Sequence, residues 1–276
     1  MDQLKRNERI GAIMYILTSR PNEIFTYNYF SKMFNVKKPS ISGDISIMKK
    51  IAKKLDIGKI ETIPGANGGV KFLPKSRKGE TEILLEDLCR RLSDGERIIP
   101  GGFIYMMDIL YTPSIIRNIG KIFANEFNHK NIDYVVTVET KGIPIALMTA
   151  DILNVPLIVI RKNTKITEGP TVNINYVSGS TKVIQTMSLS KKVLKEGSKV
   201  LVIDDFMKAG GTIKGINDMM NEFNAEVVGI GIFVSTKSPE KKLVDDYISL
   251  IQLEAVDEQN GKIYLKSNFE YLEQFK

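Results

Sequence analysis

The stretch that most constrains the fold runs from Val200 to Thr212 and reads Val-Leu-Val-Ile-Asp-Asp-Phe-Met-Lys-Ala-Gly-Gly-Thr. Its first four residues are apolar, which predicts a strand over 200–203 that is buried on both faces. Two adjacent carboxylates follow, then a turn of small residues, and then a helical pattern from Ile213. A buried strand joined in this way to a helix is typical of the parallel sheet of an α/β domain.

The same connection predicts a ligand site, because ligands of open α/β sheets bind outside the carboxyl ends of the strands. A glycine-rich turn at that edge points backbone N–H groups outward, and the helix dipole adds partial positive charge, so the turn suits a phosphate. The carboxylates of Asp204 and Asp205 suit hydroxyl groups or a metal ion on the same ligand. A sugar phosphate meets both requirements, whereas acids that only cap a helix would give a similar pattern.

The positive charge of the chain is concentrated near its N-terminus. Residues 1–76 contain 14 Lys and Arg against 6 Asp and Glu, a net charge of +8, and the rest contains 25 against 26, a net charge of −1. We therefore expect two domains, a basic one over 1–75 and a nearly neutral one over 76–276. The basic domain is expected to contact a polyanion, with nucleic acid as the first candidate and a membrane surface as the second.

The basic segment has the pattern of a winged helix-turn-helix domain. Apolar residues at i, i+3, i+4 and i+7 predict a first helix, Thr26 is the expected N-cap of a second, and Pro39 fits the first turn of a third. Two short strands are expected over 59–63 and 70–73, and the Asn-Gly pair between them is a hairpin signal.

The third helix is the expected recognition helix. Its inner face is predicted to consist of Ile41, Ile45, Met48, Ala52 and Leu55. Recognition helices use their first residues on base edges and flanking groups on phosphates. The expected DNA contacts are therefore the hydroxyls of Ser40 and Ser42 on bases or phosphates, and the ammonium groups of Lys37, Lys38, Lys49, Lys53 and, on the hairpin, Lys71. The alternative is that these lysines form only a solvated face.

Several classes of protein are excluded by composition. The chain has one cysteine, Cys89, and one histidine, His129, so it has no intrachain disulfide, no Cys/His zinc site and no second histidine for a Ser-His-Asp mechanism. The first nine residues are polar, and no apolar run reaches the roughly 20 residues of a membrane span. We expect a cytoplasmic protein without a membrane partner.

The second domain alternates strands and helices, as α/β domains do. A second strand-to-helix turn, Glu139-Thr140-Lys141-Gly142, follows the strand predicted over 133–138. Arg161 and Lys162 follow the next predicted strand, 156–160, and lead into a polar segment over 166–179 that we expect to be a mobile loop. The further expected elements are helices over 82–92, 113–128 and 143–153, strands over 183–189 and 226–234, and edge strands around a turn at Asn260-Gly261.

The 200–212 motif resembles the signature of type I phosphoribosyltransferases, which bind 5-phosphoribosyl-1-pyrophosphate (PRPP). The resemblance implies that Asp204 and Asp205 bind the ribose hydroxyls, and that Lys208, Ala209, Gly210, Gly211 and Thr212 cradle the 5′-phosphate. It places the diphosphate, with Mg²⁺, on Thr140, Lys141 and Gly142, although Lys141 alone also fits an ordinary surface lysine. Arg161 and Lys162 are further phosphate contacts or merely a basic loop entry, and Phe206, Met207, Phe103 and Tyr105 mark the base slot and its hood.

A winged helix-turn-helix domain ahead of a type I phosphoribosyltransferase-like parallel-sheet domain resembles, nearly end to end, the purine operon repressors of Gram-positive bacteria. Small departures are Gly43, which weakens a helix by about 1 kcal/mol relative to Ala, and Phe103, where Tyr is expected. The family implies a homodimer that binds double-stranded operator DNA and senses PRPP without catalysis.

PRPP, as effector with Mg²⁺, is expected to lower the affinity for DNA, and guanosine tetraphosphate is an expected competitor for the pocket. No other cofactor is expected. The alternatives are an active purine phosphoribosyltransferase with an accessory nucleic-acid-binding domain, and an RNA-binding attenuation protein.

Overall fold

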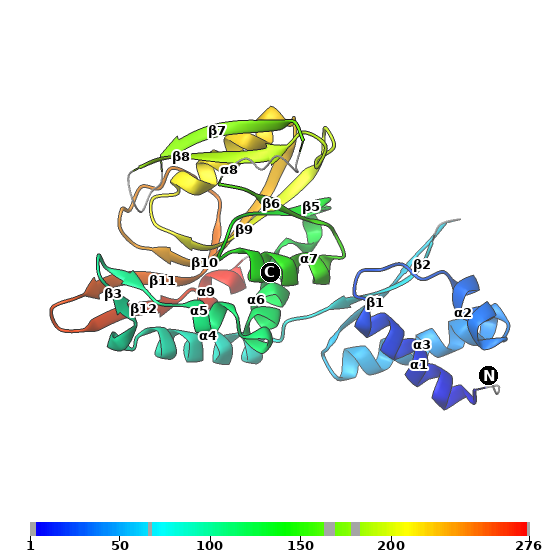
Figure 1. Cartoon of the computed structure of the whole chain (residues 1–276). Coiled ribbons are helices and arrows are strands. Elements are labelled where there is room, and N and C mark those ends of the chain that lie inside the picture. The colour runs from blue at the N-terminus through cyan, green and yellow to red at the C-terminus, as the bar shows by residue number, and fades with distance from the viewer. Residues whose placement is uncertain (1–3, 66–67, 163–168, 178–182, 275–276) are drawn as a thin grey trace. The chain divides into compact units, whose positions relative to one another are not determined.

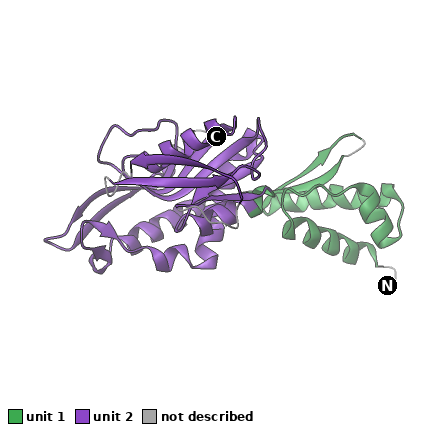
Figure 2. Ribbon diagram, turned by 45° about the horizontal axis from the view of Figure 1, so that its top comes forward, with its two compact units in different colours: residues 1–77, 151–154 green, residues 78–150, 155–276 purple. Residues whose placement is uncertain are grey.

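The computed structural model describes residues 4–65, 68–162, 169–177 and 183–274. The chain divides into two compact units (Figure 2): the first contains residues 1–77 and 151–154, and the second contains residues 78–150 and 155–276. The break after Arg77 lies two residues beyond the boundary expected from the charge pattern.

The described residues between 4 and 74 form three helices and a pair of antiparallel strands, as predicted from the sequence. The elements are α1 (Arg6–Ser19), α2 (Tyr27–Phe34), α3 (Lys38–Lys54), β1 (Gly58–Ile63) and β2 (Gly69–Pro74). The Thr26 hydroxyl accepts a hydrogen bond from the amide of Tyr29 (3.0 Å), so Thr26 caps α2 as expected. Pro39 lies in the first turn of α3. Residues 66–67, which include the asparagine of the predicted hairpin turn, lie outside the described residues.

The apolar core of the first unit includes Ile13, Leu17, Phe30, Ile41, Ile45, Met48 and Ala52. Leu55 was predicted to complete this face but is 52% exposed, so that prediction is wrong. It forms the C-cap of α3, where the chain turns away from the core. The face contains instead Asp44, whose carboxylate is fully buried.

The second unit is built on a mainly parallel sheet, as predicted. Its described strands lie in the order β12 (Lys262–Ser267), β11 (Ile248–Asp257), β10 (Glu226–Thr236), β9 (Lys199–Met207), β5 (Tyr134–Val138) and β6 (Leu157–Ile160). Only the edge pair β11–β12 is antiparallel among them. The other elements are α4 (Lys78–Leu92), β3 (Ile98–Ile99), β4 (Phe103–Ile104), α5 (Met107–Leu110), α6 (Pro113–Phe127), α7 (Ile143–Leu153), β7 (Thr171–Val177), β8 (Ile184–Ser190), α8 (Gly211–Glu222) and α9 (Phe269–Gln274).

Layers pack on both faces of this sheet, with α8 and the β7–β8 hairpin on one face and α6 on the other (Figure 1). Alternate residues of β10 face the two layers, as the twofold periodicity of a strand requires. Ile230 and Ile232 belong to the core that includes Ile213 of α8. A Cβ atom at Gly231 would lie 2.7 Å from the ring of Phe123 on α6, so the helix lies directly against the strand backbone.

The segment over 166–179, expected to be a mobile loop, contains a regular strand, so that prediction is wrong. Strand β7 pairs with β8 over its whole length. Val172, Ile174 and Tyr176 alternate with polar residues and pack on the core under the hairpin. This period-2 pattern is typical of a half-buried strand, and the asparagines between these residues masked it. Residues 163–168 and 178–182 lie outside the described part.

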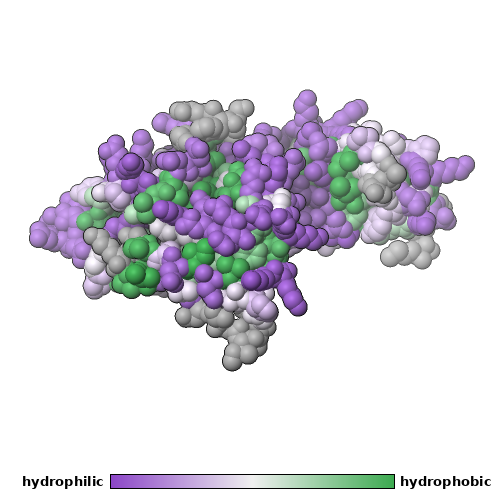
Figure 3. Space-filling model, turned by 90° about the horizontal axis from the view of Figure 1, so that it is seen from above, coloured by the Kyte–Doolittle hydropathy of each residue, from purple (hydrophilic) through white to green (hydrophobic). Residues whose placement is uncertain are grey.

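The face of the second unit that carries the hairpin shows apolar groups in separate clusters with hydrophilic groups between them (Figure 3). Exposed apolar side chains there include Val177, Ile184 and Leu243. Within the described residues, no helix combines the length and the hydrophobicity that crossing a bilayer requires.

Candidate functional site

The two adjacent acids lie at the carboxyl end of the central strand β9. The strand was expected to end at residue 203 but continues through both acids, because Asp204 and Phe206 stay in register with Ile232 and Val234 of β10. Asp204 is only 6% exposed, and its Oδ1 accepts a hydrogen bond from the amide of Asp205 (3.0 Å). Burial, and then the neighbouring Asp205 carboxylate, raises the pKa of Asp204. The two carboxylates would therefore be stabilised by a ligand that donates hydrogen bonds to them.

The glycine turn follows directly and begins α8. Gly210 adopts a left-handed conformation (φ 84°), which an L side chain rarely adopts, and the helix starts at Gly211. A small cavity of about 40 Å³ lies inside the turn and is lined by residues 206–213. Backbone N–H groups at a helix start stabilise an anion, so this turn has the chemistry of a phosphate site.

The turn is clamped from the segment that follows β10. The ammonium group of Lys242 donates to the carbonyl oxygens of Lys208 (2.6 Å) and Thr236 (2.6 Å) and to the hydroxyl of Thr236 (3.2 Å). The amide of Leu243 donates to the carbonyl of Ala209 (2.9 Å). Desolvation lowers the pKa of Lys242. The sequence analysis did not predict this clamp, because Lys242 lies more than thirty residues after the turn.

The second predicted loop packs against the acids. A Cβ atom at Gly142 would lie 2.6 Å from Oγ1 of Thr137 and 2.8 Å from Oδ1 of Asp204, so only glycine fits without displacement. The Thr137 hydroxyl is fully buried and has no hydrogen-bond partner among the described atoms. Thr140 and Lys141 are exposed at the same edge of the sheet.

Glu139 ties this loop to the end of β6. Its carboxylate accepts hydrogen bonds from Nη1 of Arg161 (3.2 Å) and from the amide of Lys162 (2.6 Å). Arg161 therefore points toward Glu139, whereas Lys162 lines the cavity beside the acids.

A cavity of about 450 Å³ brings most of the predicted residues together. Its wall includes Thr140, Lys141, Lys162, Asp204, Asp205, Phe206 and Thr212, together with Phe103 of the predicted hood. Lys208, Ala209, Gly210 and Gly211 line the smaller cavity of the turn, which shares Phe206 and Thr212 with the larger one. Met207 lines only the smaller cavity, and Tyr105 and Arg161 line neither of these two cavities. Met207 is 2% exposed within the core, and Tyr105 is 46% exposed.

Sequence reasoning missed several wall residues. Ile99, Ile104 and Met106 form an apolar wall with Phe103, and Tyr176 and Gln185 come from the hairpin. The Pro-Gly-Gly turn before Phe103 was the only available signal for the apolar wall. The hydroxyl of Tyr176 donates to Oε1 of Gln185 (2.6 Å), and burial raises the pKa of Tyr176.

The described residues contain no group of three or more His, Cys, Asp and Glu side chains placed to hold a metal ion. The adjacent carboxylates of Asp204 and Asp205 fit a cation that also takes oxygen ligands from a bound diphosphate.

The predicted DNA contacts lie mainly on the exposed face of α3 and at its start. Exposed residues there are Lys37, Lys38, Ser40, Ser42, Lys49 and Lys53. The ammonium group of Lys49 donates to the hydroxyl of Thr62 on β1 (2.7 Å), so the wing orients it. Lys71 is only half-exposed and lies 3.9 Å from the Glu61 carboxylate, which offsets its charge.

Comparison with known proteins agrees with this two-part organisation. Residues 5–74 match the family described as bacterial purine repressor, N-terminal, and residues 106–268 match the phosphoribosyl transferase domain. The chain is 45% identical over 274 residues to the purine biosynthesis transcriptional repressor PurR of Bacillus subtilis, covering 99% of this chain and 96% of that protein. The chain belongs to the PurR family of purine biosynthesis regulators.

Some members of the PurR family are named repressors and others activators. A Lactococcus lactis relative, 40% identical over 94% of this chain and 96% of its own length, is named a purine biosynthesis transcriptional activator. Among solved structures, adenine phosphoribosyltransferase from Thermoanaerobacter pseudethanolicus has a similar fold, with a TM-score of 0.53 and 22% identity over 61% of this chain and 99% of its own.

Proposed function

We propose that this protein is a DNA-binding repressor of purine biosynthesis genes, and that PRPP, bound in the 450 Å³ cavity, releases it from DNA. The observation that carries the proposal is the cavity itself. The buried carboxylate of Asp204, the half-buried one of Asp205, Thr212 of the glycine turn and the loop with Lys141 line one space, in a chain that also has a winged helix-turn-helix unit.

Each part of PRPP has a chemical counterpart in this space. The carboxylates of Asp204 and Asp205 accept hydrogen bonds from the ribose hydroxyls, which meets the demand that their burial creates. The amides and hydroxyl of residues 208–212 take the 5′-phosphate. Thr140, Lys141 and Gly142 would hold the diphosphate, Lys162 adds positive charge, and a Mg²⁺ ion bound with the ligand would offset the charge of the diphosphate.

The apolar wall supports a sensor over an enzyme. Ile99, Phe103, Ile104 and Met106 line the same cavity as Phe206 and offer shape and stacking, but their side chains carry no group that hydrogen-bonds to a purine edge. A base can stack there without being selected, which is compatible with guanosine tetraphosphate as a competitor, because the loops recognise phosphate. The enzyme alternative requires that the protein convert a purine and PRPP to a nucleotide with release of pyrophosphate.

The test is fluorescence anisotropy of a labelled duplex from upstream of a purine biosynthesis operon, titrated with protein and then with PRPP and Mg²⁺. We expect binding by a homodimer, checked by light scattering, and a 5- to 150-fold loss of affinity with PRPP, the usual range of allosteric coupling. The variant Asp204→Asn/Asp205→Asn should bind DNA as the wild type does and fail to respond to PRPP.

Three outcomes contradict parts of the proposal. Tighter DNA binding with PRPP would reverse the sign. An unchanged response in the double variant would reject the acids as the ribose site. Pyrophosphate release with a purine would favour the enzyme, and preference for single-stranded RNA would favour the attenuation protein.

A further inference from the structure

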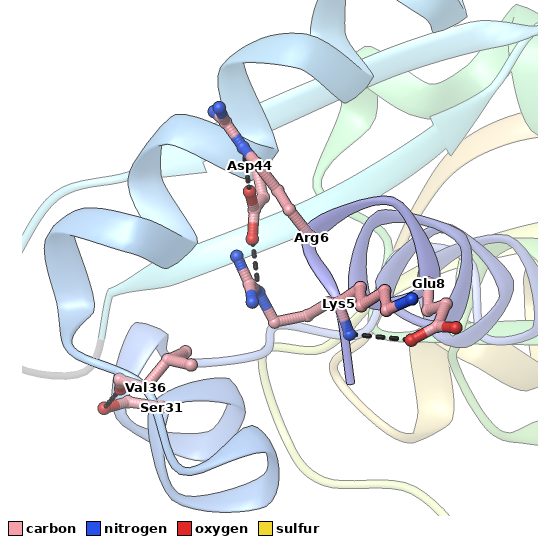
Figure 4. A network of polar contacts seen from close by, with 7 residues as sticks. Lys5, Arg6, Glu8, Ser31, Val36 and Asp44 are labelled. Atoms are coloured by element: carbon pink, nitrogen blue, oxygen red, sulfur yellow. Dashed lines mark hydrogen bonds and ion pairs between the residues drawn. The ribbon is translucent and has the colours of Figure 1, made fainter. Parts of the chain in front are cut away.

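A buried carboxylate in the recognition helix holds two arginines of α1 (Figure 4). Oδ2 of Asp44 accepts a hydrogen bond from Nε of Arg9 (2.6 Å), and its Oδ1 accepts one from Nε of Arg6 (3.2 Å). The Asp44 side chain is fully buried and that of Arg9 is 8% exposed, whereas that of Arg6 is 63% exposed. Asp44, Arg9 and Arg6 together carry a net charge of +1. Because Asp44 and Arg9 are buried, the exposed part of this charge lies on Arg6.

Asp44 positions the guanidinium group of Arg6 but accepts only one of its N–H groups. Only its Nε takes part in the bonds to Asp44, so the two Nη groups remain available to an external acceptor. The backbone beneath it is fixed, because the Lys5 amide donates to the Glu8 carboxylate (2.7 Å) at the start of α1 (Figure 4). A cation in the first turn of a helix gains nothing from the helix dipole, so the location of Arg6 calls for another explanation.

Gly43 brings this guanidinium beside the exposed side of α3. A Cβ atom at Gly43 would lie 3.4 Å from Nη2 of Arg6, so the absence of a side chain leaves the Arg6 fork uncovered. Gly43 was noted in the sequence only as a weak helix former. In the structure, the missing side chain at Gly43 leaves the Arg6 guanidinium accessible beside the first turns of α3, which carry Ser40 and Ser42.

We propose that Arg6 binds a phosphate of the DNA backbone next to α3, and that Asp44, supported by Arg9, is the residue that positions it. Arginine matches phosphate because its planar fork donates two parallel hydrogen bonds, and holding the side chain in advance lowers the entropy lost on binding. The assignment rests on the proposed DNA binding and adds a contact from α1 to those expected from α3 and the hairpin.

The test measures DNA affinity by anisotropy at several salt concentrations. Arg6→Ala should weaken binding to all duplexes by about tenfold at low salt and reduce the salt slope by about 0.9, the value for one lost phosphate contact. Arg6→Lys should keep the slope and lose only part of the affinity, since it keeps the charge without the fork. The matched control is Arg90→Ala, which removes an exposed arginine, paired with Asp87, from the second unit and should change neither quantity.

The positioning role has its own readout. In the Asp44→Asn background the loss caused by Arg6→Ala should shrink, because Arg6 is then no longer held, whereas a purely structural Asp44 would leave that loss unchanged. Thermal unfolding checks that the variants fold. If Arg6→Ala does not fold, the same measurements are made with Arg6→Lys. Wild-type affinity and slope in Arg6→Ala would overturn the inference alone, whereas absence of DNA binding by the wild-type protein would overturn the proposed function and this inference together.

Discussion

Replacement of Gly142 by alanine gives a sharp prediction for the candidate site. The added Cβ would lie 2.6 Å from Thr137 Oγ1 and 2.8 Å from Asp204 Oδ1, whereas ordinary contacts begin at about 3.4 Å. The overlaps are therefore about 0.8 and 0.6 Å. Both neighbours lie on buried strands, so relief requires a backbone shift, and overpacking of this kind costs about 1–3 kcal/mol.

The assay is thermal unfolding of the full chain with and without PRPP. For a unit of this size 1 kcal/mol corresponds to about 2–4 °C, so Gly142→Ala should lower the Tm of the second unit by roughly 2–12 °C. It should also weaken PRPP binding at least about tenfold, because a shift of the Asp204 carboxylate or of the loop disturbs the ribose and diphosphate sites together.

The matched control is Gly79→Ala in α4 of the same unit. A Cβ atom there meets nothing within 4 Å, so the same chemical change at the start of the helix should not lower the Tm and should leave PRPP binding unchanged. Equal Tm values for Gly142→Ala and the wild type, or equal PRPP affinity, would refute the close packing of this loop on the acids.

Three further predictions concern charged groups. Burial raises the pKa of Asp204 above its ordinary 3.8, so the folded state binds this proton more tightly and stability falls as pH rises from about 4 through the raised pKa. Asp204→Asn should therefore be more stable than the wild type at pH 8, by about 1 kcal/mol in urea unfolding, with a smaller gain near pH 4. Lys242→Met should weaken PRPP binding without changing DNA affinity, and equal PRPP affinity by calorimetry would show that the clamp is not needed. Arg9→Met should destabilise the first unit by about 3 kcal/mol in thermal unfolding, because the buried Asp44 keeps only the longer Arg6 contact; a loss under 1 kcal/mol would contradict this.

Local patterns in the sequence predicted the features that depend on neighbouring residues. The apolar run before Asp204 and the glycines after it specified strand, turn and helix, because burial and left-handed backbone are local requirements. The resemblance to type I phosphoribosyltransferases implied that the Gly142 loop belongs to the same site as the acids, and in the structure Gly142 packs against Asp204.

The features that sequence reasoning missed depend on partners far along the chain. The sequence analysis assigned no role to Asp44, because its burial becomes tolerable only through the approach of Arg9 from another helix. The sequence analysis likewise assigned no role to Lys242, because its hydrogen bond to the carbonyl of Lys208 exists only in the folded chain. Strand β7 was missed for another reason. Its alternating apolar residues are visible in the sequence, but the asparagines between them led to the prediction of a polar loop.

The contact between β10 and α6 has a consequence for how sequences of this fold can diverge. Gly229 and Gly231 leave no room for a Cβ beneath the rings of Phe127 and Phe123, so volume is shared between strand and helix. A larger residue on the strand becomes acceptable only with a smaller one on the helix, because volume-conserving exchanges are the ones that cores tolerate. Substitutions at these positions should therefore occur as pairs across the two layers, and a library that varies either layer alone will be depleted of folded members.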